Sequence, residues 1–155
     1  MAGTVDGRLK ELGIEIPTPA APAANYIPFV KSGNLVFVSG QIPLVAGKIE
    51  GIGKVGQDLT TEQAKAIARI CAINLIAQAK AACGGDLDKV TRVVKLGGFV
   101  NCVDGYTEQP EVVNGASDLM VDVFGDKGRH ARFAVGTNAL PRGVAVEVEA
   151  VFEVA

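Results

Sequence analysis

The sequence is poor in the residues from which metal and disulfide sites are built. It has one histidine and three cysteines in 155 residues, and the cysteines, Cys71, Cys83 and Cys102, lack CxxC spacing. An odd number of cysteines without that spacing argues against a disulfide framework and against a zinc site. His130 alone cannot supply the paired ligands of an HExxH motif, which is absent. We therefore expect reduced thiols in the core and a structural or surface role for His130.

Membrane spans, export signals and nucleic-acid sites are equally unsupported. No stretch of about 18 apolar residues occurs, and residues 1–13 carry charges where a secretory signal needs an apolar core. The formal net charge is -2, and the lysines and arginines form no cluster that would neutralise phosphates. The sequence therefore predicts a soluble, cytoplasmic protein with neither a membrane nor a nucleic acid as partner.

Apolar residues, by contrast, are plentiful enough for one core. The chain is 48% hydrophobic, which at this length predicts a single globular domain, placed here at residues 25–155. Residues 1–24 are expected to form an arm. Within it, residues 5–16 predict a short helical turn with Leu9 and Leu12 on one side, before an extended segment forced by Pro17, Pro19 and Pro22.

Two amphipathic helices separate the predicted strands. The first begins at Thr60 or Thr61, with capping-box spacing from Thr60 to Gln63, and ends at residues 84–85. The second covers residues 110–125. Strands are predicted at 25–31, 35–39, 89–100, 130–137 and 144–154. This order predicts an α+β fold in which both helices cover one face of a mixed sheet, so the other face must be solvated or buried by a partner.

Residues 51–56 match the pattern GxGxxG. As a dinucleotide-binding motif it needs a strand before it and a helix that opens directly on its last glycine. Here the predicted helix begins several residues later. A flexible β-turn loop is therefore favoured.

Arg132 is the candidate anchor for an acidic ligand. Ala134 and Gly136, on the same side of its strand, are too small to fill the space beside a guanidinium, whose planar fork matches a carboxylate. The alternative is an ordinary interface salt bridge. Glu147 and Glu149 share one face of the last strand, where one of them could pair with Arg132 or orient a water. A solvated sheet face is the alternative for Glu149.

Several segments together resemble the YjgF/RidA family, over nearly the whole chain from Asn25 onward. The most specific part is the closing stretch from His130 to Ala150. The resemblance is carried by Ser39-Gly40-Gln41-Ile42-Pro43, Gly98-Phe99-Val100-Asn101, Val113-Asn114, His130-Ala131-Arg132-Phe133-Ala134-Val135, Leu140-Pro141 and Val146-Glu147-Val148-Glu149-Ala150. It implies a chorismate-mutase-like (YjgF) α+β fold assembled as a homotrimer, whose sheets face inward and whose three equivalent sites lie between neighbouring subunits.

The resemblance also implies an activity. In active members the arginine matching Arg132 binds the substrate carboxylate, and the glutamate matching Glu147 helps to place the attacking water. The loop matching Ser39-Gly40-Gln41 and the asparagine matching Asn114 border the cleft. The implied reaction is hydrolysis of a 2-imino or enamino acid to a 2-keto acid and ammonia, without a cofactor.

Two residues beside the arginine depart from the family pattern. Phe133 stands where typical deaminases have a small hydroxyl residue, and Ala134 replaces a cysteine, so both are expected to line a substrate pocket of altered shape. Tyr26 is not matched to the family's N-terminal tyrosine, because the segment around it differs in length. A trimer that binds 2-keto acids without turnover is the alternative function. The endoribonuclease label of some relatives is not favoured, because the chain has no basic stripe and one histidine.

Overall fold

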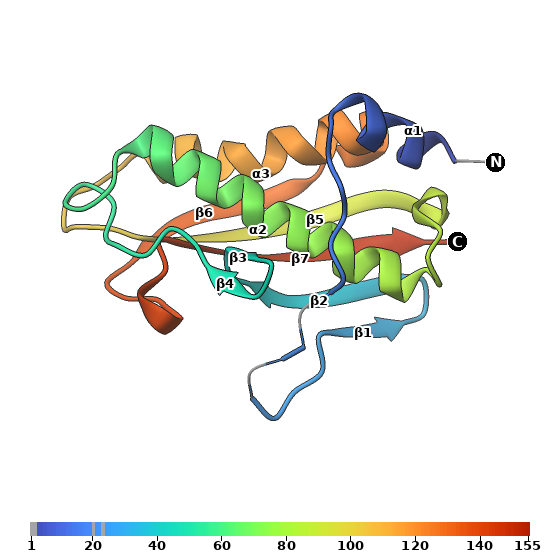
Figure 1. Ribbon diagram of the computed structural model, residues 1–155, viewed down its shortest axis with the longest axis horizontal. Coiled ribbons are helices and arrows are strands. Elements are labelled where there is room, and N and C mark those ends of the chain that lie inside the picture. Colours follow the sequence, from blue (N-terminus) through green and yellow to red (C-terminus); the bar gives the residue numbers. More distant parts are fainter. Residues whose placement is uncertain (1–2, 20, 23) are drawn as a thin grey trace.

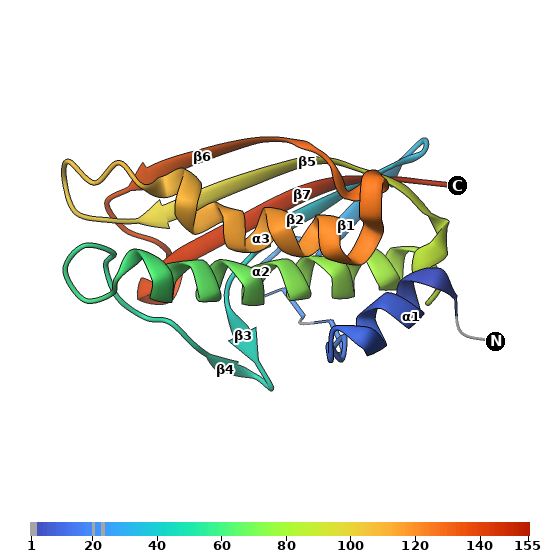
Figure 2. The same cartoon turned by 90° about the horizontal axis from the view of Figure 1, so that it is seen from above.

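Two long helices lie on one face of a five-stranded sheet (Figures 1 and 2). The computed structural model describes residues 3–19, 21–22 and 24–155. Its helices are α1 (Thr4–Glu11), α2 (Thr61–Ala82) and α3 (Gln109–Phe124). Its strands are β1 (Phe29–Ser32), β2 (Leu35–Gln41), β3 (Leu44–Val45), β4 (Lys48–Ile49), β5 (Val90–Asn101), β6 (Ala131–Thr137) and β7 (Val146–Val154). The predicted α+β architecture is confirmed.

The sheet is mixed, as predicted. Its strand order is β1-β2-β7-β5-β6, and β5 and β6 run parallel whereas the other neighbours run antiparallel. The register sets which residues share a row: Phe99 on β5 pairs with Glu147 on β7 and with Val135 on β6. Because β6 forms one edge of the sheet, Arg132 lies on an edge strand, separated from β7 by β5.

The long helices begin and end close to where the sequence predicts. At the start of α2 the Thr60 hydroxyl accepts a hydrogen bond from the Gln63 backbone N–H at 3.1 Å, and the Gln63 side chain accepts one from the Thr60 N–H at 2.9 Å. Gly84 follows the helix with φ of 64°, in the left-handed region that glycine adopts without strain. None of the described helices is long and apolar enough to cross a membrane.

The N-terminal helix is held by a residue far along the chain. The Asp88 carboxylate accepts hydrogen bonds from the backbone N–H groups of Thr4 and Val5, each at 3.0 Å. Those N–H groups have no partner inside the helix, so Asp88 acts as its N-terminal cap. Leu9 is buried in the core, but Leu12, which follows the last residue of α1, is 41% exposed.

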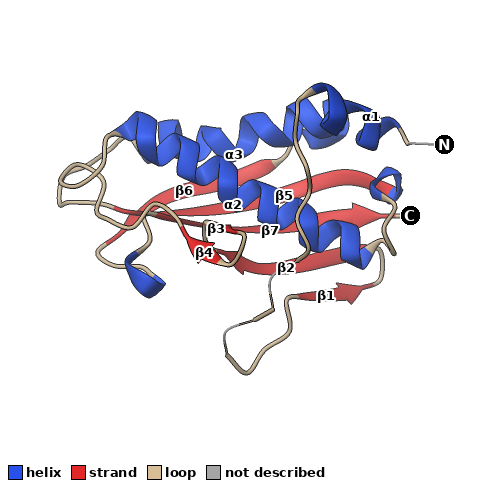
Figure 3. Cartoon of the chain, in the orientation of Figure 1, coloured by secondary structure: helices blue, strands red, loops and turns tan. Residues whose placement is uncertain are grey.

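Short elements were not predicted. A two-stranded hairpin, β3–β4, follows β2, and 3-10 turns occupy Leu87–Lys89, Gly125–Gly128 and Pro141–Gly143 (Figure 3). Residues 51–56 form a loop fastened to the sheet by backbone bonds such as Val55 N–H to the Asn101 carbonyl, 2.8 Å. Because α2 begins only at Thr61, the loop interpretation of GxGxxG is confirmed.

The face of the sheet opposite α2 and α3, hereafter the open face, is not covered by any described part of the chain (Figure 2). Phe37 and Val135 on this face are 47% and 42% exposed. Phe133 stacks edge-on against Phe99, with ring centroids 5.2 Å apart. Side chains at alternate positions of β7 point to this face, and those between them are buried against the helices.

Candidate functional site

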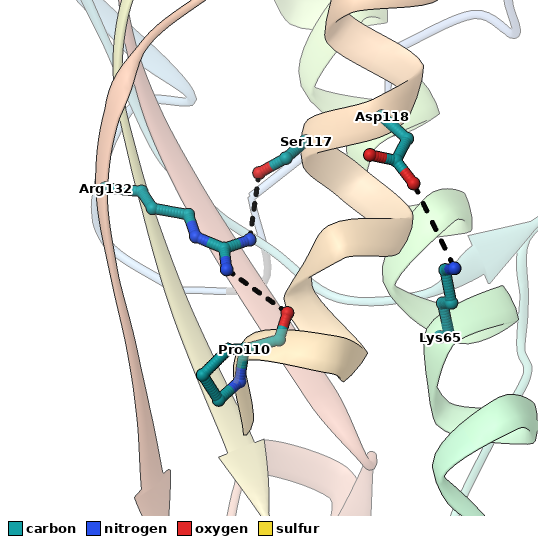
Figure 4. A network of polar contacts seen from close by, with 5 residues as sticks. All are labelled: Lys65, Pro110, Ser117, Asp118 and Arg132. Atoms are coloured by element: carbon teal, nitrogen blue, oxygen red, sulfur yellow. Dashed lines mark hydrogen bonds and ion pairs between the residues drawn. The ribbon is translucent and has the colours of Figure 1, made fainter. Parts of the chain in front are cut away.

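Arg132 points from the edge strand β6 toward α3. Its Nη1 donates to the Ser117 hydroxyl at 3.1 Å, and its Nη2 donates to the Pro110 carbonyl at 3.2 Å (Figure 4). Among the described residues no carboxylate forms an ion pair with it. A guanidinium has five N–H groups, so these two contacts leave three for a ligand.

Asn114 lies on the same stripe of α3 as the two partners of Arg132. Residues 110, 114 and 117 are spaced four and three apart, and such residues line one side of a helix. Asn114 is half-buried. On the strand, Ala134 packs against the core, and a side chain at Gly136 would collide with Cys102 and Gln109. The space that the sequence predicts beside Arg132 is therefore filled at its Gly136 end.

Glu147 projects from β7 onto the open face, the opposite side of the sheet from α3. Its carboxylate packs against the backbone of Gly40, where any Cβ would overlap it. Burial raises the pKa of the Glu147 carboxyl, and the negative charge of nearby Glu149 raises it further. A side chain at position 40 would require this carboxylate to move, which gives Gly40 a physical reason at the end of β2.

A pocket of about 180 Å³ opens beside Glu147. Gly40 and Gln41 form one wall, and the segment Ser39–Gln41, expected as a loop, is the end of strand β2. The buried Gln41 side chain donates to the Ser39 carbonyl at 2.9 Å, and the Ser39 hydroxyl donates to the Ile27 carbonyl at 2.9 Å, but Ser39 does not line the pocket. Tyr26 lines the same pocket, although sequence comparison gave it no match. Arg142, which the sequence did not single out, lines it too, with φ of 62° in the Pro141–Gly143 turn.

Within one chain the candidate residues thus form two separate half-sites. The Arg132 half-site, with Asn114 and Ser117, lies between β6 and α3. The Glu147 half-site, with Gly40, Gln41 and Tyr26, lies beside the end of β2. Neither Glu147 nor Glu149 pairs with Arg132 in the described structure, because alternation along the strands directs these side chains to opposite faces.

Phe133 and Ala134 fall on different sides of β6. The Phe133 ring covers Gly97 on the open face, where a Cβ would collide with it. Lys95 Nζ lies 5.5 Å from the centroid of the same ring. Phe133 therefore points away from the guanidinium of Arg132 in its own chain.

His130, expected to be structural or on the surface, contacts Gly128 and Ser117 and lies close to Arg132. Its Nδ1 is 2.6 Å from the Gly128 carbonyl oxygen, and its Nε2 is 2.9 Å from the Ser117 hydroxyl. Burial lowers the pKa of His130, the bond to Gly128 offsets part of that change, and the charge of Arg132 lowers the pKa again. Ser117 was missed by sequence reasoning; its helical spacing from Pro110 and Asn114 was the only signal.

The remaining sequence predictions concern thiols and metals. Cys71, Cys83 and Cys102 are free and buried, as expected, and burial strongly raises the pKa of the Cys71 thiol. Within the described ranges, no group of three or more histidine, cysteine, aspartate or glutamate side chains could hold a metal ion.

Comparisons with known proteins place this arrangement in a family. Residues 6–152 match the family described as "YjgF/chorismate mutase-like, putative endoribonuclease". Protein TCP17 from Trypanosoma cruzi is 50% identical over 155 residues, covering 98% of this chain and 95% of that protein.

Solved structures agree with this match. The crystal structure of Atu1372 from Agrobacterium tumefaciens, whose function is unknown, is 50% identical with a TM-score of 0.92, covering 97% of this chain and 92% of that one. A "putative endoribonuclease" from Shewanella oneidensis is 34% identical with a TM-score of 0.94, covering 98% and 100%. TdcF from E. coli with bound serine, at 21% identity, shares the fold, with a TM-score of 0.65 over 89% and 94% of the chains. The chain therefore belongs to the YjgF/chorismate mutase-like family.

Proposed function

We propose that this protein hydrolyses 2-imino or enamino acids to 2-keto acids and ammonia in the cytoplasm, at clefts between the subunits of a homotrimer. The observation that carries the proposal is the division of the site into two half-sites within one chain. Among the described residues, a cation without a carboxylate partner lies at a sheet edge, and a half-buried carboxylate lies beside a pocket at the end of β2. A neighbouring subunit that brings its Glu147 half-site to the Arg132 half-site would complete a cleft with both groups.

Arg132 suits the anchoring of the substrate carboxylate. Its guanidinium is already fixed by Ser117 and Pro110 at 3.1 and 3.2 Å, so little side-chain freedom is lost when a ligand binds. The three N–H groups that remain can donate to both oxygens of a carboxylate. TdcF, which shares the fold, binds serine, an amino acid with such a carboxylate.

Glu147 suits the placement of the attacking water. The imine carbon is already electrophilic, so the cleft needs mainly to orient it and to hold a water near it. Water adds to the C=N carbon while a proton passes to nitrogen, and collapse of the resulting carbinolamine releases ammonia and leaves a C=O bond. A carboxylate whose pKa is raised toward neutrality is a better proton acceptor for this water than an ordinary glutamate.

Two other activities are weaker candidates. Phe133 and Ala134 stand in place of a hydroxyl residue and a cysteine, which favours a trimer that binds 2-keto acids without turnover as the alternative. RNA cleavage is less well supported, because both ring nitrogens of the one histidine are engaged and the net charge is -2.

The test generates imines in situ with an amino-acid oxidase and traps them with semicarbazide. Added wild-type protein is expected to divert the imines to 2-keto acid, whereas Arg132→Ala should lose at least about 100-fold of this activity, because the anchor is charged and bidentate. Arg129→Ala, which removes an exposed arginine paired with Asp126 at 3.4 Å, is the matched control and should stay active.

Failure of the wild type across small and bulky imines would reject the hydrolase. Saturable stabilisation by pyruvate in the same preparation would then support the binding trimer. Equal activity of Arg132→Ala and wild type would reject Arg132 as the anchor.

A further inference from the structure

Two acceptors on α3 hold the guanidinium of Arg132, and only one of them belongs to a side chain. The Pro110 carbonyl is part of the helix backbone, but the Ser117 hydroxyl can rotate, so its usefulness as an acceptor depends on where its own proton points. The group that accepts this proton therefore determines whether the hydroxyl oxygen faces Arg132.

For a neutral His130 ring, the directions of the hydrogen bonds follow from which groups can donate and which can accept. Arginine only donates, so Ser117 Oγ must accept from Nη1. The Gly128 carbonyl only accepts, so the proton of the neutral His130 ring must be on Nδ1, 2.6 Å away. This leaves Nε2 bare, and the Ser117 O–H donates to it across 2.9 Å. One continuous chain thus runs from the Gly128 carbonyl through His130 and Ser117 to Arg132.

Burial, and after it the charge of Arg132, lowers the pKa of His130 and favours the neutral imidazole. Arg132 lies beyond Ser117, and Arg129 precedes His130 on its own segment. Arg92 of β5 and Glu153 of β7 line the same surface hollow as His130. Three of these four groups are cationic. A neutral imidazole can accept from Ser117, which a protonated one cannot.

We propose that Ser117 and His130 are positioning residues, which hold the Arg132 guanidinium in the orientation that receives the substrate carboxylate. The inference rests on the proposed function, because it takes Arg132 as the anchor of the substrate carboxylate. It assigns no contact with substrate to Ser117 or His130. His130 orients the serine hydroxyl, and the hydroxyl fixes the guanidinium edge that faces α3. The remaining N–H groups are thereby presented to the ligand.

The positioning role predicts a change in KM and little change in kcat. A carboxylate that Arg132 holds equally in the ground state and the transition state contributes to KM and not to kcat. Ser117→Ala is expected to raise KM for the imine and Kd for pyruvate about tenfold, the usual range for one hydrogen bond to a charged group, and to change kcat less than about threefold. Ser117→Thr keeps the hydroxyl and should restore both constants to within about threefold of wild type.

A second variant tests His130 without removing its loop contact. In His130→Asn the amide can still donate to the Gly128 carbonyl but is too short to reach Ser117, so KM should rise about threefold. Asp118→Ala is the matched control, because Asp118 is the next residue on α3 but pairs with Lys65 on α2 at 4.0 Å (Figure 4). It should bind pyruvate like wild type.

The chain's single histidine permits a direct observation of the ring. Nitrogen-15 NMR of the wild type should show one set of imidazole signals, with a protonated Nδ1 and a bare Nε2 at neutral pH. Pyruvate bound at Arg132 should raise the pKa of His130, because the anion offsets the nearby positive charge. In Arg132→Ala, pyruvate should leave this pKa unchanged.

The outcomes distinguish the positioning role of Ser117 and His130 from the anchoring role of Arg132. If Arg132→Ala loses pyruvate binding while a folded Ser117→Ala and His130→Asn bind like wild type, the positioning role is rejected and the proposed anchor stands. If Arg132→Ala binds pyruvate normally, the anchor itself is wrong, and the positioning role falls with it. An Nε2-protonated ring in the wild type also overturns the positioning role, whether or not Ser117→Ala folds.

Discussion

At the scale of single residues, Glu147 links stability to pH. Its pKa is higher in the folded chain than in the unfolded one, so the folded state holds this proton more tightly. The associated stability is present below the unfolded pKa and is lost as pH rises through the folded pKa. Glu147→Gln should therefore raise the melting temperature at pH 7, by an amount that shrinks as pH falls toward the unfolded pKa of glutamate.

The same substitution should remove the water-placing group. Turnover is expected to fall on the order of 10²- to 10⁴-fold, the usual contribution of a general base. Glu149→Gln removes a charge that raises the pKa of Glu147, so that pKa should fall in the variant. The acid limb of the pH–rate profile of Glu149→Gln should therefore move to lower pH. An acid limb at the wild-type position would show that a different group titrates.

Individual site residues differ in how far the sequence can predict them. Arg132 and Glu147 follow from strand alternation and from the family resemblance. Ser117 and Arg142 do not, because nothing in their neighbourhood distinguishes them until the fold brings β6 against α3 and the Pro141–Gly143 turn against β2. The direction of Phe133, away from its neighbour Arg132, follows from alternation alone.

At the scale of elements, the helices that carry their own signals were predictable. The capping box of Thr60 and Gln63 is local, and so is the glycine that ends each long helix. The cap of α1 is not local, since Asp88 lies 84 residues from Thr4. The β3–β4 hairpin has two residues in each strand, too few for alternation to be recognised.

The distant cap predicts a local opening. Asp88→Ala removes both acceptors from the first turn of α1, a loss of about 0.5–2 kcal/mol for a capping residue. Because α1 buries few residues, among them Val5 and Leu9, the expected effect is on α1 and not on global unfolding. Trypsin cleavage after Arg8 and Lys10 should accelerate about 2- to 30-fold, the factor that corresponds to this free energy.

Asp126→Ala provides the control for this experiment. Asp126 borders the same surface hollow as Asp88 but pairs with Arg129. Its loss should leave the cleavage rate unchanged, and a wild-type rate in Asp88→Ala would contradict the capping role.

At the scale of the whole molecule, the open face is the feature that one chain does not complete. Phe37 on β2 lies on this face, paired in register with Val30 and Val151. A charge buried at an assembled face is costly. Wild-type protein should therefore sediment near three times 16.0 kDa, whereas Phe37→Asp should shift toward the single-chain mass and lose imine hydrolysis with the clefts.

Val45→Asp is the matched control for assembly. Val45 is also exposed, at 45%, but it lies on the β3–β4 hairpin beyond α2 (Figure 2). This variant should keep the wild-type mass. A wild-type protein that sediments as a single chain would reject the trimer and the shared cleft together.

The separation in sequence between α1 and its cap also sets a delay during synthesis of the chain. Synthesis of the 84 residues from Thr4 to Asp88 takes roughly 4 to 17 s at about 5–20 residues per second. During that interval an eight-residue helix has neither its cap nor its docking surface, and helices this short are marginal in water. Helix α1 thus leaves the ribosome well before the contacts that hold it.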